Sequence, residues 1–292
     1  MTAGISGSRF TGGSTKNTFR VAVAFALAAI ACFVTRPVPA AETLTIGGTG
    51  GALGTMKRLS AAFEKSHPGI TVVVIPNLGS GGGIRAVAKG AIDIGLSVRA
   101  MTADERKLGL GATEYAKTPL VFAVRAGNPL PGLNQEEFLG VLQGGRNASL
   151  HGQRMRPILR PANDAETLLV KKHFPAIGAA IERTLSSRVD ATVALTSQEA
   201  ADLIAKIPGA VGFSPLSLIR SEDRPLKVLP FNGVAPDAAN VADGSYPLVL
   251  DLYLVTRRDP PDRVRQFIGF VRSQPGRRIL EESGNFAIGK RQ

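Results

Sequence analysis

The sequence of 292 residues is poor in the side chains that carry most metal and redox chemistry. It has a single cysteine, Cys32, together with no tryptophan, three tyrosines and three histidines. One thiol excludes an internal disulfide and a site built from several thiolates. The histidines at His67, His151 and His173 are far apart and lack the spacing of metal ligands. We therefore expect no metal site.

Catalytic and nucleotide-binding motifs are also missing. Ser80 does not lie in the G-x-S-x-G elbow of a hydrolase. Gly48, Gly50 and Gly54 miss the G-x-G-x-x-G spacing of a dinucleotide site, and no G-x-x-x-x-G-K-[ST] loop is present. The sequence thus predicts a protein that is not an enzyme, with no catalytic residues and no cofactor.

The charge is strongly positive but evenly spread. The formal net charge is +12, and no run of five basic residues occurs. With so few aromatic side chains there is little to stack on bases, so nucleic acid is not an expected partner. A diffuse positive field favours encounter with small anions instead.

The first 41 residues are typical of an export signal. They contain four basic groups and no acid, so the rest of the chain carries +8. The apolar run at residues 21–34 is too short to span a bilayer comfortably, and small residues for signal peptidase follow at 38–41. A membrane anchor is one alternative, and a lipoprotein attached through Cys32 is another. We expect residues 1–41 to be removed and the protein to be periplasmic.

The remaining chain alternates between strand and helix patterns. Strands are predicted at 42–47, 70–76, 92–97, 118–124, 157–160 and 246–255. Helices are predicted at 53–65, 84–89, from Thr102, and at 135–143, 164–173, 198–207 and 264–271. This alternation of strands and helices predicts an α/β sheet with helices on its faces.

Three loops rich in glycine or serine follow predicted strands. They comprise residues 48–51, 79–83 (GSGGG) and 97–99. Ligands of α/β sheets gather at the carboxyl ends of the strands, and glycines before a helix expose N–H groups to an anion. The loops therefore indicate an anion-binding edge, although 79–83 also fits a tight turn without a ligand.

Several segments, taken in order, are similar to a known family. They are 63–69 (FEKSHPG), 79–84 (GSGGGI), 90–99 (GAIDIGLSVR), 208–213 (PGAVGF), 244–248 (GSYPL) and 267–273 (FIGFVRS) with Gly276. Together they resemble the phosphate-binding proteins of phosphate ABC transporters over nearly the whole chain after residue 41.

The resemblance implies a type II-like periplasmic binding protein fold. Such a protein has two α/β lobes, two crossing segments and a ligand cleft, and we expect lobe 1 at 42–123 plus 247–292 and lobe 2 at 124–246. It implies a monomeric solute-binding protein that takes phosphate or a related small oxyanion and delivers it to an ABC permease in the inner membrane. The alternative is a non-transport binding or sensor module with another small polar ligand.

The resemblance also implies ligand-binding residues. Ser80 stands where the family has a ligand-binding serine, Arg160 where it has the anion-pairing arginine, and Leu53 in the first loop. Gly81 and Ser97 complete the predicted set.

Three positions depart from the family's pattern. Ala52 and Val98 stand where hydroxyl or acidic residues are usual, and 164–166 (DAE) replaces Ser-Gly-Thr. Two acids beside a bound dianion would repel it unless they are paired or point away, and Asp164 is also a fitting helix N-cap. The sequence predicts that the fold is kept while the affinity for phosphate is reduced.

Overall fold

The computed structural model describes residues 1–9, 41–76, 78–187 and 192–288. The chain divides into two compact units, residues 1–40 and 41–292. The predicted export signal falls mostly on residues 10–40 and so lies outside the described residues. Within the described ranges no helix is both long enough and apolar enough to cross a membrane.

The first part of unit 41–292 is a parallel sheet with helices packed on it. Its strands are β1 (Glu42–Gly48), β2 (Ile70–Ile75) and β3 (Ile94–Ser97), and its helices are α2 (Gly50–Ser66), α3 (Gly79–Ala88) and the single turn α4 (Ala103–Arg106). β1 pairs in parallel with β2 and with β3. Both α2 and α3 therefore begin just after the carboxyl end of a strand of this sheet.

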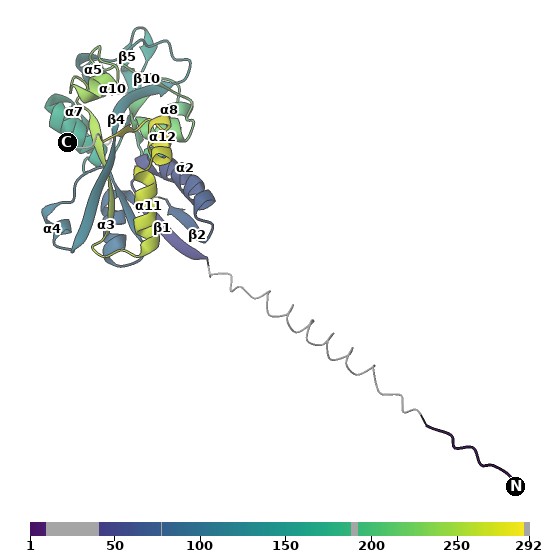
Figure 1. Ribbon diagram of the computed structural model, residues 1–292. Coiled ribbons are helices and arrows are strands. Elements are labelled where there is room, and N and C mark those ends of the chain that lie inside the picture. The colour runs from purple at the N-terminus through teal and green to yellow at the C-terminus, as the bar shows by residue number, and fades with distance from the viewer. Residues whose placement is uncertain (10–40, 77, 188–191, 289–292) are drawn as a thin grey trace. The chain divides into compact units, whose positions relative to one another are not determined.

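One long strand, β4 (Leu110–Arg125), runs through both halves of the unit (Figure 1). From Leu110 to Pro119 it pairs antiparallel with β11 (Val249–Arg257), and from Leu120 to Val124 it pairs antiparallel with β9 (Ala210–Pro215). β11 also pairs with β3, so it lies between two strands that precede it by more than a hundred residues.

The second half is built around β9. The sheet continues from β9 to β7 (Arg156–Leu159) and then to β8 (Thr192–Val193), both joined in parallel. The helices of this half are α5 (Gln135–Gln143), α6 (Ala165–His173), α7 (Pro175–Ser187), α8 (Ser197–Lys206), α9 (Leu216–Ser221) and α10 (Ala238–Ala242). The short elements β5 (Ser149–Leu150), β6 (Gln153–Arg154), η1 (Gly145–Asn147) and β10 (Leu226–Leu229) complete it.

The chain finishes back on the first half. Helices α11 (Asp262–Arg272) and α12 (Gln274–Glu282) precede β12 (Phe286–Ala287), which pairs with β4. α11 buries Val264, Phe267 and Val271, and the ring of Phe267 lies edge-on to Phe63 of α2. An apolar stripe at this spacing predicts such a helix, and the closing helix is confirmed.

Among the elements that differ from what the sequence pattern predicts, two show the reason clearly. β4 begins at Leu110, eight residues before the predicted strand, because residues 110–117 pair with β11 although polar side chains interrupt their apolar pattern. α7 was not predicted; Ile177 and Ile181 on its buried face lie four residues apart within an alanine-rich stretch.

Contacts between the two halves also occur at α9. Ser217 Oγ donates to the carbonyl of Gly51 at 2.7 Å, and the Arg58 Nε donates to the carbonyl of Ser221 at 2.9 Å. α9 therefore docks on α2 although it belongs to the later part of the chain.

Candidate functional site

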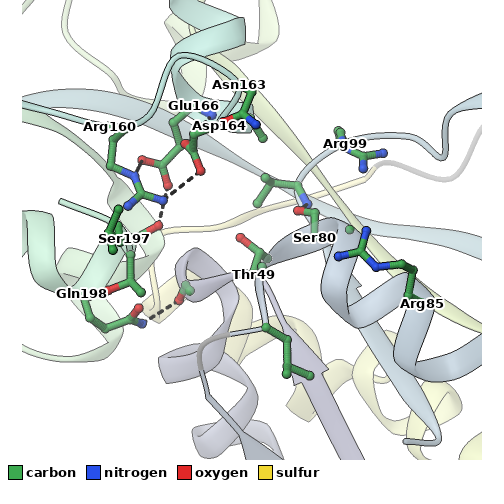
Figure 2. A pocket seen from close by; sticks show the side chains of 18 residues that line it. Thr49, Ser80, Arg85, Arg99, Arg160, Asn163, Asp164, Glu166, Ser197 and Gln198 are labelled. Carbon is green, nitrogen blue, oxygen red and sulfur yellow. Dashed lines mark hydrogen bonds and ion pairs between the residues drawn. The ribbon is translucent and has the colours of Figure 1, made fainter. Parts of the chain in front are cut away.

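A cavity of about 430 Å³ lies between two groups of residues far apart in sequence. One group follows β1, β2 and β3, and the other follows β7 and β8 (Figure 2). The lining residues are Thr49, Gly50, Leu78, Gly79, Ser80, Gly81, Arg85, Val98 and Arg99 on the first side and Arg160, Asn163, Asp164, Ala165, Glu166, Leu195, Thr196, Ser197 and Gln198 on the second.

The first side presents two helix N-termini. Thr49 and Leu78 are the N-cap residues of α2 and α3, neither accepts a hydrogen bond with its side chain, and neither helix has an acidic residue in its first turn. Free N–H groups and the helix dipole at such ends favour an anion. This side is therefore electropositive without any side chain taking part.

The glycines of residues 79–83 have a packing role as well. A Cβ at Gly83 would stand 2.8 Å from the carbonyl oxygen of Gly47, so only glycine lets α3 approach β1 this closely. The hydroxyl of Ser80 accepts the Val98 N–H at 3.2 Å, which leaves its own proton free to donate. Residues 79–83, predicted as a loop, therefore form the first turns of α3, which are held against β3 with the Ser80 hydroxyl available to donate into the cavity.

Two arginines stand on the same side but differ in their partners. Arg99 makes a bidentate pair with Glu105, with distances of 2.7 and 2.8 Å. The hydrogen bond from Arg99 lowers the pKa of Glu105 to about 2, so this pair is neutral as a unit. Arg85 is exposed, and its side chain makes no hydrogen bond or ion pair with any described residue. Its charge is therefore free for a ligand.

The second side is built around Arg160, which is only 5% exposed. Its Nη1 donates to the carbonyl of Ala194 and its Nη2 to Asp164 Oδ2, both at 2.8 Å, and its Nε lies 3.6 Å from Glu166 Oε2. Two carboxylates thus surround one guanidinium (Figure 2). The other oxygen of Asp164 accepts the Glu166 N–H at 3.0 Å, so Asp164 caps α6 and also faces the cavity.

Glu166 is the most deeply buried acid of this group. It is 2% exposed, and its Oε1 accepts a 2.6 Å hydrogen bond from Ser197. Burial and, to a smaller extent, the charge of Asp164 raise the pKa of Glu166 to about 7, against the opposing effects of Arg160 and Ser197. Glu166 therefore titrates near neutral pH.

Gln198 joins the two sides. Its Nε2 donates to the carbonyl of Gly50 at 2.9 Å and to Glu222 Oε1 at 3.1 Å. Because Gly50 opens α2 and Gln198 lies in the first turn of α8, this contact ties the two halves together at the cavity.

The structure brings three of the five predicted ligand-binding residues together. Ser80, Gly81 and Arg160 all line the cavity. Leu53 and Ser97 do not line it: Leu53 is buried in the core, and the hydroxyl of Ser97 donates to the carbonyl of Arg99. The two acids of residues 164–166 face the cavity and are also paired with Arg160.

Sequence reasoning missed Arg85, Ser197 and Gln198, which line the cavity; Thr49, which also lines it, lies in the loop at residues 48–51 that the sequence indicated. Arg85 lies six residues after Gly79 in the helix that the glycine loop opens, a position that the motif itself indicates. Gln198 and Ser197 carry no such signal, because their place follows from how α8 meets α2. No group of three or more metal-ligating side chains occurs in the described parts of the chain.

The architecture and the cleft between two α/β halves are those of a periplasmic binding protein, and a comparison with protein families agrees. A family model described as a PBP superfamily domain matches residues 34–275, which is most of the chain. The chain belongs to this superfamily, and the predicted two-lobed α/β fold is confirmed.

The individual proteins that are similar to this chain have low sequence identity to it. The phosphate-binding protein PstS of Borreliella burgdorferi is 22% identical over 258 residues, covering 85% of this chain and 90% of that protein. A substrate-binding protein from Clostridium perfringens with bound phosphate has a similar structure, with a TM-score of 0.70, 18% identity, and coverage of 85% and 100%. An ABC-type phosphate transport receptor from Vibrio cholerae gives a TM-score of 0.59 at 23% identity, with coverage of 84% and 100%.

Proposed function

We propose that this protein is an exported solute-binding protein that holds a small oxyanion in its cleft and delivers it to an ABC permease. The observation that carries the proposal is the cavity itself, where the uncapped N-termini of α2 and α3 face the same space as Ser80 and Arg85. The names of the similar proteins, which are phosphate-binding proteins and phosphate transport receptors, support the choice of a transported oxyanion.

The lobes are proposed to divide at β4 and at the return to β11. Lobe 1 comprises about 42–123 plus 247–292, and lobe 2 comprises 124–246. The change of partner along β4, from β11 to β9 at Leu120, supports a boundary near this point. A second crossing near Tyr246 is supported by the hydrogen bond from its hydroxyl to the carbonyl of Leu120. Two crossing segments permit hinge closure around a ligand.

Within the cleft, the oxyanion is proposed to bind at the N-terminus of α3. Backbone N–H groups at Ser80 and Gly81 and the hydroxyl of Ser80 supply donors there. Arg160 lies across the cavity, where its guanidinium is already engaged by Asp164 and Ala194. It is therefore proposed to set the shape and charge of the opposite wall. Leu53 and Ser97 are not included, since neither reaches the cavity.

The protein is further proposed to act as a monomer without catalysing a reaction. Transport receptors of this architecture need only a single chain and reversible closure. The permease in the inner membrane is its proposed partner, and nucleic acid is not.

Export is tested by expressing the full chain in a bacterial host and measuring the mass of the product. A periplasmic product that begins near residue 42 supports removal of the signal. A lipid-modified product that begins at Cys32 would place the protein on the membrane as a lipoprotein, and an uncleaved product would contradict export by a removable signal.

Ligand binding is tested by a thermal-shift titration of the exported protein with phosphate, sulfate, molybdate and phosphonates. A ligand at a hundred times its dissociation constant stabilises the fold by about 2.7 kcal/mol, which is readily seen as a raised melting temperature. Ser80→Ala should weaken binding of whichever oxyanion responds, while Ser186→Ala on the exposed face of α7 should not. If no compound that carries an oxyanion, whether from this panel or a carboxylate, stabilises the protein, the proposal is wrong.

A further inference from the structure

The charged groups around the cavity are balanced in number but separated in space. Arg85 and Arg160 are matched by Asp164 and Glu166, and Arg99 is already neutralised by Glu105. Arg85 stands beside the N-termini on the first side, while both cavity-lining acids stand on the second side (Figure 2). Above the pKa of Glu166, where both acids are ionised, the cavity is neutral as a whole, positive on one wall and negative on the other.

The negative wall, on the second side of the cavity, has two carboxyl groups, those of Asp164 and Glu166, but only one arginine, Arg160, to pair with them. Arg160 makes a hydrogen bond with Asp164, but its Nε is 3.6 Å from Glu166 Oε2, beyond hydrogen-bond distance. Neither that nitrogen nor that oxygen has a hydrogen-bond partner among the described residues, although both are buried. When both acids are ionised, one guanidinium faces two carboxylates, and Asp164, the more accessible of the two, presents the excess negative charge to the cavity.

A bare oxyanion does not match this wall. The carboxylate of Asp164 occupies the N-terminus of α6 and one edge of Arg160, the two donors that an anion would need there. An approaching anion would meet a carboxylate instead, and like charges at close range repel. A group that donates hydrogen bonds and carries positive charge is complementary to it.

The space between the walls is larger than a tetrahedral oxyanion and partly apolar. Five heavy atoms displace on the order of two to three water volumes, or ~60–90 Å³, whereas the cavity measures about 430 Å³. Leu78 and Val98 line it on the first side, and Leu195 on the second side is 71% exposed. These side chains suit a short carbon skeleton.

We propose that the ligand of this cleft is a small organic zwitterion, in which a short carbon chain joins an oxyanion to an ammonium group. The inference rests on the proposed function and deepens it. The oxyanion binds at the N-terminus of α3 and pairs with Arg85, and the ammonium binds Asp164, whose position is held by Arg160. Asp164 and Arg85 are then the residues that determine specificity, one for each end of the ligand.

The test compares ligands that differ in one end only, by calorimetric titration of the exported protein. The set is 2-aminoethylphosphonate, ethylphosphonate, inorganic phosphate and β-alanine, the last with a carboxylate in place of the phosphonate. An amino compound should bind at least tenfold more tightly than ethylphosphonate and phosphate, because a charge-assisted hydrogen bond is gained. Whether the phosphonate or the carboxylate binds more tightly identifies the oxyanion.

Two variants separate the ends of the ligand. Asp164→Asn keeps a side chain that caps a helix well, so α6 is expected to stay folded. It should remove most of the preference for the amino compound over ethylphosphonate. Arg85→Gln should weaken both of these ligands alike by about tenfold. Asp259→Asn, at a fully exposed site, is the matched control and should leave every affinity unchanged.

The outcomes distinguish this inference from the proposed function. If phosphate or ethylphosphonate binds the wild-type protein as tightly as the amino compounds, the zwitterion is wrong while the oxyanion receptor stands. The same conclusion follows if Asp164→Asn leaves the preference intact. If none of the four compounds binds, and the wider oxyanion panel is silent too, both proposals fail together.

Discussion

Replacing Glu166 by glutamine should change how the stability of the protein depends on pH. Glu166 is a buried carboxyl whose pKa is raised from 4.5 to about 7, chiefly by burial. A raised pKa means that the folded protein holds this proton more tightly than the unfolded chain does. The resulting stabilisation is complete below pH 4.5 and is lost as the pH rises through about 7.

The magnitude follows from the size of the shift. Each pKa unit corresponds to about 1.36 kcal/mol, so the free energy of unfolding of the wild type should fall by about 2–3 kcal/mol between pH 5 and pH 8 through this group. Glutamine keeps the shape of the side chain and can still accept the hydrogen bond from Ser197, but it does not ionise. The variant should therefore gain about that much relative to the wild type over the same interval.

Urea unfolding at pH 5, 6, 7 and 8 measures the effect. Glu281→Gln, an exposed position on α12, is the control and should follow the wild-type profile. If the wild type and Glu166→Gln show parallel profiles, Glu166 does not titrate near neutral pH, and the burial argument is refuted.

Two further predictions concern the contacts between the lobes. Gly50→Ala would place a Cβ 2.4 Å from Gln198 Oε1, so the side chain of Gln198 must move. Ligand affinity measured by calorimetry should then fall, with little change in melting temperature. The control Gly269→Ala has open space around it in α11 and should stabilise the fold by about 1 kcal/mol. Tyr246→Phe removes the buried 2.8 Å hydrogen bond to Leu120 at the crossing and should lower the free energy of unfolding by about 1–2 kcal/mol in urea; an unchanged midpoint would show that this bond contributes no net stability.

The sequence pattern predicted most of the elements but not how the distant ones meet. β2 and α5 were predicted almost residue for residue: the β-branched run that ends at Pro76 is a local signal, and the structure shows that α5 also begins with a local signal, the Asn134–Glu137 capping box. The first eight residues of β4 were missed, since only pairing with β11 makes this polar stretch a strand.

In the candidate site, too, local patterns indicate some residues, while others are brought together only by the tertiary structure. The glycine-rich loop pointed to Ser80 and Gly81, and the change at residues 164–166 pointed to two acids near Arg160. Neither signal shows that Asp164 is at once a helix cap, the partner of Arg160 and a wall of the cavity. Ser197 and Gln198 became visible only when the two lobes were placed against each other. Contacts between lobes depend on tertiary geometry, which no local pattern contains.

The position of β11 has a consequence for the order in which the protein folds. This strand lies between β3 and β4, and it reaches the sheet only when residues 249–257 are available. A chain that ends before Val249 has β2-β1-β3 as one sheet fragment and β4-β9-β7-β8 as another, with nothing to join them. Contacts so distant in sequence form slowly, because a long loop must close before they stabilise anything. The sheet therefore begins with β1, the first strand of the unit 41–292, but its two parts cannot join until the last sixth of the chain is available to supply β11.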